Sequence, residues 1–476
     1  MTSSLLGYIQ QGAGALSQRH HSPVKPLAAP PVGSGLDPVF GDFGLPLLGH
    51  TLDTMSGDPM EFALDRFDRY GEVYWLGSLG TKMVGAVGPD ALESITLNKD
   101  KAWGNEGFYN YLIGPFFKRG VMLMDFGEHV HHRRIMQEAF TRPRLVGYLE
   151  AMQPRIKAEV ANWQPGEAFH VYSAAKQLTL DVAAEVFVGD RDTSNHAAIS
   201  KAFVDAVHGG QAIIRADVPG GIWRRGLRGR RLLEDYFYAQ IPAKRANPTN
   251  DLFSVLCHSA SDEGDTYTDE DIVNHMIFVM MAAHDTSTIT LAMMAYYLGR
   301  NPEWQERLRQ ESLALGKDFI EYDDIEKLPV MDMVMRETLR IHAPVGGLFR
   351  EAVKDTELCG RYIPEGTRLF ASIFASQRME PWWSNPLKFD PERFSPERRE
   401  DKKHRFMWTP FGGGAHKCIG LYFGEMEIKA VMHQMVRQFD WSVPRGYYPP
   451  LRYGTGPMPT DGLPLQLRSL RQANAA

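Results

Sequence analysis

Cysteine is scarce in this chain of 476 residues, which contains only Cys257, Cys359 and Cys418. An odd number of cysteines at wide spacing excludes a disulfide framework and indicates a reducing, intracellular compartment. An excess of positive charge is lacking as well, because 52 lysines and arginines are outnumbered by 58 aspartates and glutamates. The resulting net charge of −6 argues against nucleic acid as a partner.

The first 22 residues lack a positively charged segment followed by a long apolar run, so we expect neither a signal peptide nor a membrane anchor there. We therefore expect a cytoplasmic protein, with peripheral membrane contact left open. Residues 23–46 are rich in proline, which favours an extended chain. No linker interrupts the sequence that follows, so we predict a proline-rich N-terminal extension over 1–40 and one domain over 41–476.

Hydrophobic periodicity predicts a mainly α protein with a minor β part. We expect helices near 59–70, 127–134, 145–187, 197–210, 226–245 and 328–342, and strands near 73–76, 83–87 and within 350–375. The longest apolar run, 276–298, is long enough to cross a bilayer. Because His284 and Asp285 at its centre would be costly in lipid, we interpret it as a helix buried through a protein core.

Residues 103–120 are rich in aromatic side chains and glycine but have no helical or strand period. Two interpretations stay open for this segment: a loop that lines the core, or the wall of an apolar substrate pocket. The residues concerned are Phe108, Tyr109, Tyr111, Phe116 and Phe117.

The stretch 411–420 combines three consecutive glycines with a lone cysteine. Glycine loses side-chain burial and adds an entropy cost, which is explained if the backbone must pass close to a large flat group. Cys418 comes at the start of an apolar helical pattern, where helix-terminal N–H groups stabilise a thiolate. A thiolate held against a flat group is typical of an axial ligand to haem iron. The alternative is a buried, inert thiol.

The centre of the long apolar helix carries Asp285 and Thr286 after the small residue Ala283. The threonine hydroxyl could simply donate to the carbonyl four residues earlier and bend the helix. The functional interpretation is that Ala283 leaves room for a diatomic ligand, while Asp285 and Thr286 pass protons to oxygen as it is reduced.

Three histidines in four residues, His129, His131 and His132, could indicate a metal site. No companion ligand stands at a convincing spacing, so we favour another interpretation. His129 and Arg133 lie four residues apart on one helix face and suit an anionic group such as a propionate.

Glu337 and Arg340 lie three residues apart among apolar neighbours. They are either an exposed helix pair or a buried pair, and a buried pair needs further partners to offset desolvation. Arg393 could supply a second cation.

Together these residues resemble the motifs of the cytochrome P450 family, in the family's order and with similar spacing from about residue 41 to the C-terminus. The most specific part is the pattern F-x-x-G-x-x-x-C-x-G, formed by Phe411, Gly414, Cys418 and Gly420. The resemblance implies the triangular, mainly α fold of that family. It also implies haem b, iron protoporphyrin IX, between the long helix and the helix that follows Cys418.

The resemblance implies a role for each of these residues. Cys418 would be the thiolate ligand, in a loop with Phe411 and Gly420, and Ala283, Asp285 and Thr286 would form the oxygen-activation groove. Glu337, Arg340 and Arg393 would form a structural triad, and His129, Arg133, Arg350 and His416 would be the contacts to the haem.

Two residues depart from the family pattern. His416 replaces the usual arginine two residues before the cysteine, which makes one contact to a propionate weaker or dependent on pH. Ala283 replaces the usual glycine of the groove. His416 and the histidine in the long helix look like the sterol 14α-demethylase branch and its bacterial relatives, but this local similarity does not establish a sterol substrate.

The implied reaction is monooxygenation with O2 of a large apolar substrate of the steroid, terpenoid or fatty acyl type. Electrons would come from separate proteins, a ferredoxin and its reductase. Lys402, Lys403, Arg405 and Lys417 could dock such an acidic partner or could simply be solvated. Two alternatives are a haem-thiolate peroxygenase or isomerase, against which Asp285 and Thr286 argue, and a non-catalytic haem-binding protein.

Overall fold

The computed structural model describes residues 22–51, 53, 59–78, 80–189, 196–210, 212, 214–261, 264–453 and 456–470. The chain forms two compact units. The first unit comprises Met1–Tyr109 and Val345–Lys417, and the second comprises Asn110–Pro344 and Cys418–Ala476. Part of the extension predicted over 1–40 lies outside the described residues, and its described part belongs to the first unit.

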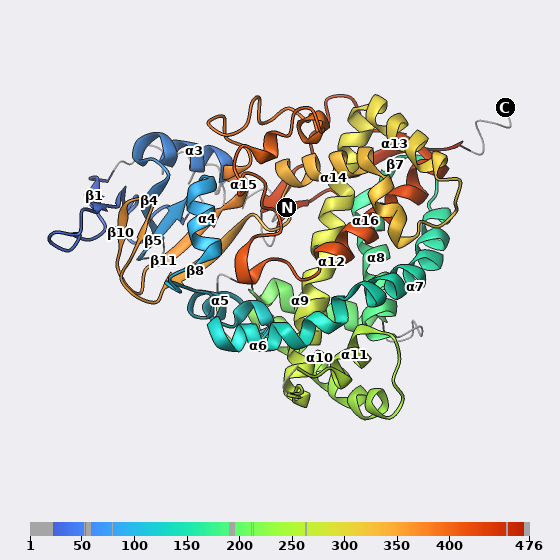
Figure 1. The fold of residues 1–476 in the computed structure, drawn as a ribbon, viewed down its shortest axis with the longest axis horizontal. Coiled ribbons are helices and arrows are strands. Elements are labelled where there is room, and N and C mark those ends of the chain that lie inside the picture. The colour runs from blue at the N-terminus through green and yellow to red at the C-terminus, as the bar shows by residue number, and fades with distance from the viewer. Residues whose placement is uncertain are drawn as a thin grey trace. The chain divides into compact units, whose positions relative to one another are not determined.

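The described part of the first unit contains a seven-stranded sheet in the order β1-β3-β4-β5-β11-β8-β6. β4 and β5 form the hairpin that the sequence predicts, and β5 pairs in parallel with β11 from far along the chain (Figure 1). β8 and β11 are antiparallel and are the strands expected around 350–375. The strands are β1 (Lys25–Pro26), β3 (Phe40–Asp42), β4 (Val73–Ser78), β5 (Thr81–Ala86), β6 (Trp103–Gly104), β8 (Gly347–Ala352) and β11 (Arg368–Ser372).

A smaller sheet of the first unit holds part of the proline-rich segment. β2 (Asp37–Pro38) pairs in parallel with β10 (Arg361–Ile363), which also pairs with β9 (Thr356–Leu358). The helices and 3-10 turns of this unit are α3 (Pro59–Tyr70), α4 (Pro89–Leu97), α15 (Ile373–Ser376), η5 (Pro391–Phe394), η6 (Glu400–Lys402) and η7 (Gly414–His416).

Helix α3 confirms the helix predicted over 59–70. Met60, Ala63 and Phe67 recur on one helix face, and they pack against Val87 and Phe374. This apolar face fixes α3 beside the end of the sheet.

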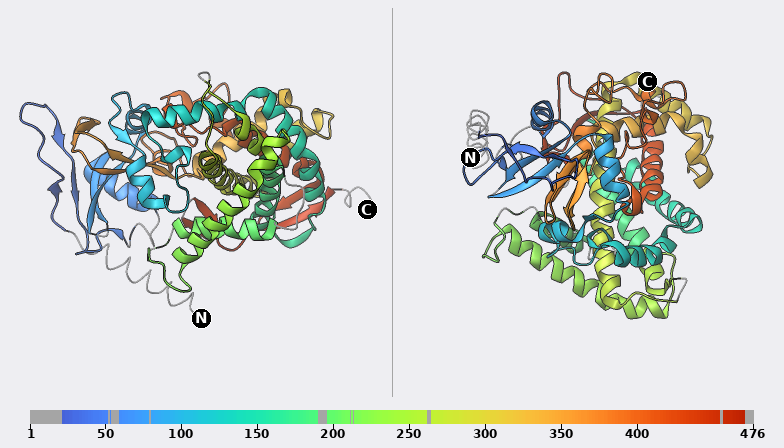
Figure 2. Two further views of the ribbon diagram at one scale, coloured as in Figure 1. Left: turned by 90° about the horizontal axis from the view of Figure 1, so that it is seen from below. Right: turned by 60° about the vertical axis from the view of Figure 1, so that its left-hand side comes forward.

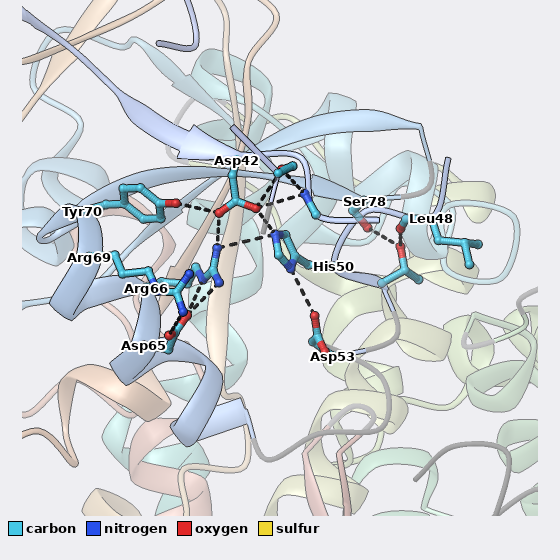
Figure 3. A network of polar contacts seen from close by, with 12 residues as sticks. Asp42, Leu48, His50, Asp53, Asp65, Arg66, Arg69, Tyr70 and Ser78 are labelled. Atoms are coloured by element: carbon cyan, nitrogen blue, oxygen red, sulfur yellow. Dashed lines mark hydrogen bonds and ion pairs between the residues drawn. The ribbon is translucent and has the colours of Figure 1, made fainter. Parts of the chain in front are cut away.

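A buried polar network ties β3 to α3 and to His50 in the segment between them (Figure 3). Asp42 Oδ1 lies 2.7 Å from His50 Nε2, the Tyr70 hydroxyl donates to Oδ2 at 2.6 Å, and Arg66 forms an ion pair with the same carboxylate. Burial would raise the pKa of Asp42, but the hydrogen bonds from His50 and Tyr70 and the charge of Arg66 together lower it. Asp42 is therefore held as a carboxylate. Its network has a structural role and contains none of the predicted site residues.

Helix α12 (Asp269–Arg300) runs through the second unit and is drawn in yellow in Figures 1 and 2. It begins earlier than the apolar run because Thr268 and Asp271 cap its N-terminus reciprocally. The helix is long and apolar enough to cross a membrane, yet 72% of its most apolar window is buried within the protein. That setting agrees with the predicted core helix.

Most of the remaining elements of the second unit are helices, and several of them pack directly against α12. α8, α10, α14 and α16 all pack against α12. The helices are α6 (Phe126–Gln137), α7 (Arg142–Ala161), α8 (Val171–Ala183), α9 (His196–Gly210), α10 (Ile222–Ala246), α11 (Leu252–His258), α13 (Pro302–Ala314), α14 (Pro329–Ile341) and α16 (Leu421–Gln438). Short turns of 3-10 or π type are η1 (Val121–Leu123), η2 (Glu138–Phe140), η3 (Ala184–Val188) and η4 (Tyr322–Lys327).

Two small sheets complete the second unit. β12 (Phe439–Ser442) and β7 (Gly166–His170) flank β15 (Pro464–Ser469), and β13 (Leu451–Tyr453) pairs with β14 (Pro457–Pro459). The sequence does not predict β7, since most of its residues are exposed and show no apolar alternation.

Part of the segment 103–120 forms a helix, α5 (Glu106–Ile113), which the sequence does not predict. The boundary between the two units falls within this helix. Its buried residues, Phe108 and Tyr109, are adjacent rather than three or four positions apart. The helical period that a sequence pattern would reveal is therefore missing.

Candidate functional site

Cys418 is exposed and stands just before α16, whose N-cap is Gly420. No disulfide involves the cysteines of the chain. Cys257 differs because burial raises the pKa of its thiol to about 11, so it stays protonated at neutral pH. An accessible sulfur at a helix N-terminus is the setting in which a thiolate can act as a metal ligand.

Arg133, on α6, lies within electrostatic reach of Cys418. Burial lowers the pKa of the Arg133 guanidinium, and the charge of Cys418 raises it in part. His129, one turn earlier, is buried. The two residues thus share a helix face, as the sequence predicts, and Arg133 supplies a positive charge beside the sulfur.

His132 contacts other protein side chains, and within the described part of the chain it belongs to no metal-binding group. Its Nδ1 lies 2.9 Å from His275 Nε2, and its ring stacks on Tyr267. Among the residues that the structure describes, no group of three or more His, Cys, Asp or Glu side chains is suited to hold a metal ion.

The middle of α12 is partly accessible within an otherwise buried stretch of the helix. Over 272–299, a range described in full, every residue is buried except Met281, Ala282, Ala283, Asp285 and Thr286. Beside this part of the helix is a pocket of about 450 Å³, its solvent-open part included. It is lined by residues of α8, α9, α12 and β14, with Lys176, His208, His284 and Asp285 as the polar groups.

Asp285 is held as a carboxylate in this pocket. Burial would raise its pKa, but a hydrogen bond from His284 and the positive charges of His284, Lys176 and His208 together lower it. His284 Nδ1 lies 3.1 Å from Asp285 Oδ1, and His284 Nε2 lies 3.2 Å from the backbone oxygen of Lys176. The sequence predicts Asp285 as a proton carrier but not its contact with His284.

Thr286 makes the contact with the carbonyl four residues earlier, which the sequence leaves open as one interpretation. Its hydroxyl donates to the backbone oxygen of Ala282 at 2.8 Å, as Thr290 does to that of Thr286. The lone pairs of the Thr286 oxygen remain available as acceptors. The neighbouring Ser287 instead donates to Glu427 Oε2 of α16 at 2.5 Å.

Glu427 is a residue that sequence reasoning missed. It is fully buried, and burial raises its pKa to about 8 despite the hydrogen bond from Ser287, so it is largely protonated at neutral pH. An acidic residue within the apolar stretch of α16 is the signal that could have singled it out. Its partner, 140 residues away, could not be found from spacing.

Glu337 and Arg340 form a buried ion pair on α14. Both side chains are 0% exposed, and the guanidinium donates to both carboxylate oxygens, with distances of 2.7 Å from Nε and 2.9 Å from Nη2. In the first unit, Arg393 forms an ion pair with Glu400 at 3.0 Å and donates to the backbone oxygen of Asn385 at 2.9 Å. The structure leaves the predicted triad untested.

The other predicted haem contacts lie in the first unit. Arg350 is buried on β8 and donates to the backbone oxygen of Phe349 at 2.7 Å. His416, in η7, lies with Nδ1 3.2 Å from the Asn105 side-chain nitrogen, which places Nδ1 as the acceptor of an amide hydrogen. Phe411 is partly buried and packs against Trp408.

Gly414 has a reason for being glycine that the sequence does not reveal. Its φ is +60°, and an added Cβ would lie 1.9 Å from the backbone oxygen of Thr96 on α4. This close approach involves protein backbone, and the approach of the loop to a flat ligand stays a prediction.

The five aromatic residues, for which the sequence leaves open both a core-lining loop and a substrate wall, pack mainly against protein. Phe108 and Tyr109 contact Phe349, Phe116 contacts Trp223, and Phe117 is buried. Tyr111 is 49% exposed, with the Arg215 guanidinium 4.5 Å from its ring centre. None of them lines the pocket beside Asp285. Their role toward a substrate stays a prediction.

Comparisons with known proteins cover nearly the whole chain. A family model described as cytochrome P450 matches residues 39–463. Cytochrome P450 136 of Mycobacterium tuberculosis is 46% identical over 452 residues, which cover 94% of this chain and 92% of that protein. The lanosterol 14-alpha demethylase of Mus musculus is 26% identical over 422 residues, which cover 86% and 83%. The solved structure of the retinoic acid-bound cyanobacterial CYP120A1 matches with a TM-score of 0.81 at 26% identity, over 90% of this chain and 98% of that chain.

Proposed function

The chain belongs to the cytochrome P450 family and is a haem-thiolate monooxygenase that binds haem b, and from this premise we propose a substrate class, a proton path and an electron source for it. The substrate is a large apolar molecule, and separate redox proteins supply the electrons. When bound, the haem supplies the iron at which O2 is activated, with thiolate donation favouring O–O cleavage.

Cys418 is the ligand of the iron in this proposal, and the single observation that supports it best is its electrostatic interaction with Arg133. A thiolate carries a negative charge that must be balanced when a flat apolar ring covers it. The exposed Cys418, the nearby guanidinium and the partly accessible residues 281–283, 285 and 286 of α12 fit such a group. Arg133 and His129 bind propionates in this proposal. The same role for Arg350 and His416, and a place for Phe411 in the loop against the haem, rest on the family resemblance.

Asp285 and Thr286 move protons in this proposal. The Asp285 carboxylate borders the pocket, so it can take a proton from water there and pass it on along the proposed path. The Thr286 hydroxyl donates its hydrogen to the Ala282 backbone oxygen. The hydroxyl oxygen of Thr286 can therefore accept a hydrogen bond and hold a water in place. Ala283 keeps the adjacent helix surface small.

Glu337 and Arg340 have a structural role in this proposal. The bidentate ion pair of Glu337 and Arg340 needs further hydrogen-bond partners to offset the desolvation of both charges. Arg393 is the further partner that we propose. The division into an extension over 1–40 and a catalytic domain over 41–476 is likewise our proposal.

Support for an apolar substrate comes from the lining of the pocket, and support for a large one comes from the names of relatives. Phe203, Val207, Met280 and Met281 line the pocket, and methionine adapts to irregular apolar guests. The names of the mouse relative and of the cyanobacterial structure mention lanosterol and retinoic acid, both large and apolar.

A ferredoxin with its reductase is the proposed electron source, and the cytoplasm is the proposed location. Lys402, Lys403, Arg405 and Lys417 are all exposed, as docking of an acidic protein requires. Lys402 and Arg405 already form ion pairs with Asp401 and Glu93, which leaves part of this charge compensated within the protein.

The test is a binding screen followed by turnover. A sterol, a diterpenoid acid and a long-chain fatty acid are titrated into the haem-loaded protein, and displacement of iron-bound water is followed as a shift of the Soret band. Compounds that bind are then incubated with ferredoxin, reductase, NADPH and O2. Hydroxylated product under these conditions supports the proposal, whereas product with hydrogen peroxide alone and none with O2 would favour a peroxygenase.

A further inference from the structure

The two ring nitrogens of His284 both face acceptor oxygens. Nε2 lies 3.2 Å from the Lys176 backbone oxygen, and Nδ1 lies 3.1 Å from Asp285 Oδ1. His284 is buried, so water cannot readily replace either partner. A neutral imidazole carries only one N–H and can satisfy only one of these two oxygens.

A proton count resolves the conflict. A carbonyl oxygen only accepts, so Nε2 must carry a hydrogen in this geometry. Nδ1 would then point a lone pair at a carboxylate unless a second proton lies between them. One proton added to the pair, on Nδ1, satisfies both contacts and turns them into charge-assisted hydrogen bonds.

The charged groups around the pair favour an ionised Asp285. Lys176 and Tyr172 on α8, His208 on α9 and Arg452 on β13 interact electrostatically with Asp285 or with one another. Asp205 on α9 acts on His208 from the same side. Lys176 is positive and favours the carboxylate form of Asp285, whereas Arg452 acts on Tyr172 and His208.

We propose that His284 is a positioning residue that stores a proton on Nδ1 and hands it to Asp285 Oδ1. The inference rests on the proposed role of Asp285 and deepens it, since it names the donor from which that carboxylate is reprotonated. When the Nδ1–H bond breaks, the O–H bond on Asp285 forms, and His284 remains as the neutral Nε2–H tautomer bound to the Lys176 oxygen. Water in the pocket then returns the proton to Nδ1.

A purely structural role is the competing explanation, because the Nε2 contact also fixes α12 to α8. Two substitutions separate the possibilities. His284→Gln can keep a donor toward the Lys176 oxygen but has no titratable nitrogen, whereas His284→Ala loses both. His258→Asn is the matched control, because the His258 ring nitrogens face the backbone oxygens of Ser254 and Arg245, with no carboxylate.

The first measurement needs no turnover. Histidine labelled with nitrogen-15 is observed by NMR in the diamagnetic, carbon monoxide-bound reduced protein, with the His284 signals assigned by their loss in His284→Gln. We expect both ring nitrogens of His284 to be protonated at pH 7, and Nδ1 to lose its proton in Asp285→Asn. An unprotonated Nδ1 in the wild-type protein overturns the proposal.

The second measurement is the fraction of consumed O2 released as peroxide, with ferredoxin, reductase and NADPH, between pH 6 and 8. We expect this fraction to rise with pH in the wild-type protein. In His284→Gln it should be insensitive to pH and roughly tenfold higher at pH 6, below the ~10²–10⁴ effect of losing a general acid–base group itself. His258→Asn should match the wild-type protein.

Asp285→Asn separates this inference from the function on which it rests. If Asp285→Asn leaves the peroxide fraction unchanged, the proposed proton path is wrong and the role of His284 is overturned with it. If Asp285→Asn raises the fraction while His284→Gln keeps the wild-type value and pH dependence, only the role of His284 is overturned.

Discussion

The Ser287 hydroxyl donates a hydrogen bond of 2.5 Å to Glu427, which joins α12 to α16 inside the second unit. One helix carries Asp285 and Thr286, and the other begins just after Cys418. The contact therefore links the helix of the proposed proton path to the helix of the proposed iron ligand.

Glu427 should make stability depend on pH. Its folded pKa, about 8, lies above the ordinary value of 4.5. The folded state therefore binds the proton more tightly, and the unfolding free energy should fall as pH rises from about 4.5 to about 8. In Glu427→Gln that slope should vanish, leaving the variant more stable than wild type at pH 8 by roughly 1–4 kcal/mol, at about 1.4 kcal/mol for each pKa unit.

Urea unfolding of the haem-loaded protein at pH 5, 6.5 and 8 measures this effect. Glu425→Gln is the control on the same helix, since Glu425 is partly exposed and pairs with Lys429. An identical pH slope in wild type and Glu427→Gln would contradict the account of a neutral, buried Glu427.

Thr286→Ala should increase peroxide release at the expense of product, because the acceptor oxygen that holds water in the proton path is lost. The fold should be nearly unaffected, since the hydroxyl bonds only within its own helix, to Ala282. Peroxide and product per O2 consumed are the measurement, and Thr290→Ala, which loses an equivalent intrahelical bond, is the control. Unchanged coupling in Thr286→Ala would mean that other groups carry the protons.

Gly414→Ala should disrupt the loop before Cys418. The new Cβ would lie 1.9 Å from the Thr96 oxygen, and φ is +60°, so both packing and backbone oppose any side chain. We expect a lower thermal midpoint and weaker haem retention on gel filtration. Gly424→Ala, in α16 with no atom within 4 Å of its added Cβ, should be neutral or stabilising by up to about 1 kcal/mol. Equal behaviour of the two variants would show that the Thr96 contact does not constrain the loop.

The sequence predicts the parts of this protein that have a local signature. The α12 helix follows from the longest apolar run of the sequence, and the place of Cys418 just before a helix follows from the apolar pattern after the glycine-rich loop. α5 escapes prediction because its buried aromatics are adjacent, and β7 because it is largely exposed.

The contacts that shape the site depend on residues far apart in the chain. Ser287 and Glu427 meet across 140 positions, and Thr96 explains Gly414 from α4. No spacing rule connects such residues, because the packing of helices and not the local chain brings them together. The pair His284 and Asp285 is adjacent in sequence, but its meaning depends on the Lys176 oxygen of another helix.

The central claim is that Cys418 is the thiolate ligand of a haem iron, and the spectrum of the reduced protein with carbon monoxide tests it most directly. We predict an absorption band at ~450 nm, the mark of a thiolate opposite the bound gas. Cys418→Ser should abolish the band, while Cys257→Ser, at a buried thiol, should retain it. A normal band in Cys418→Ser would contradict the assignment.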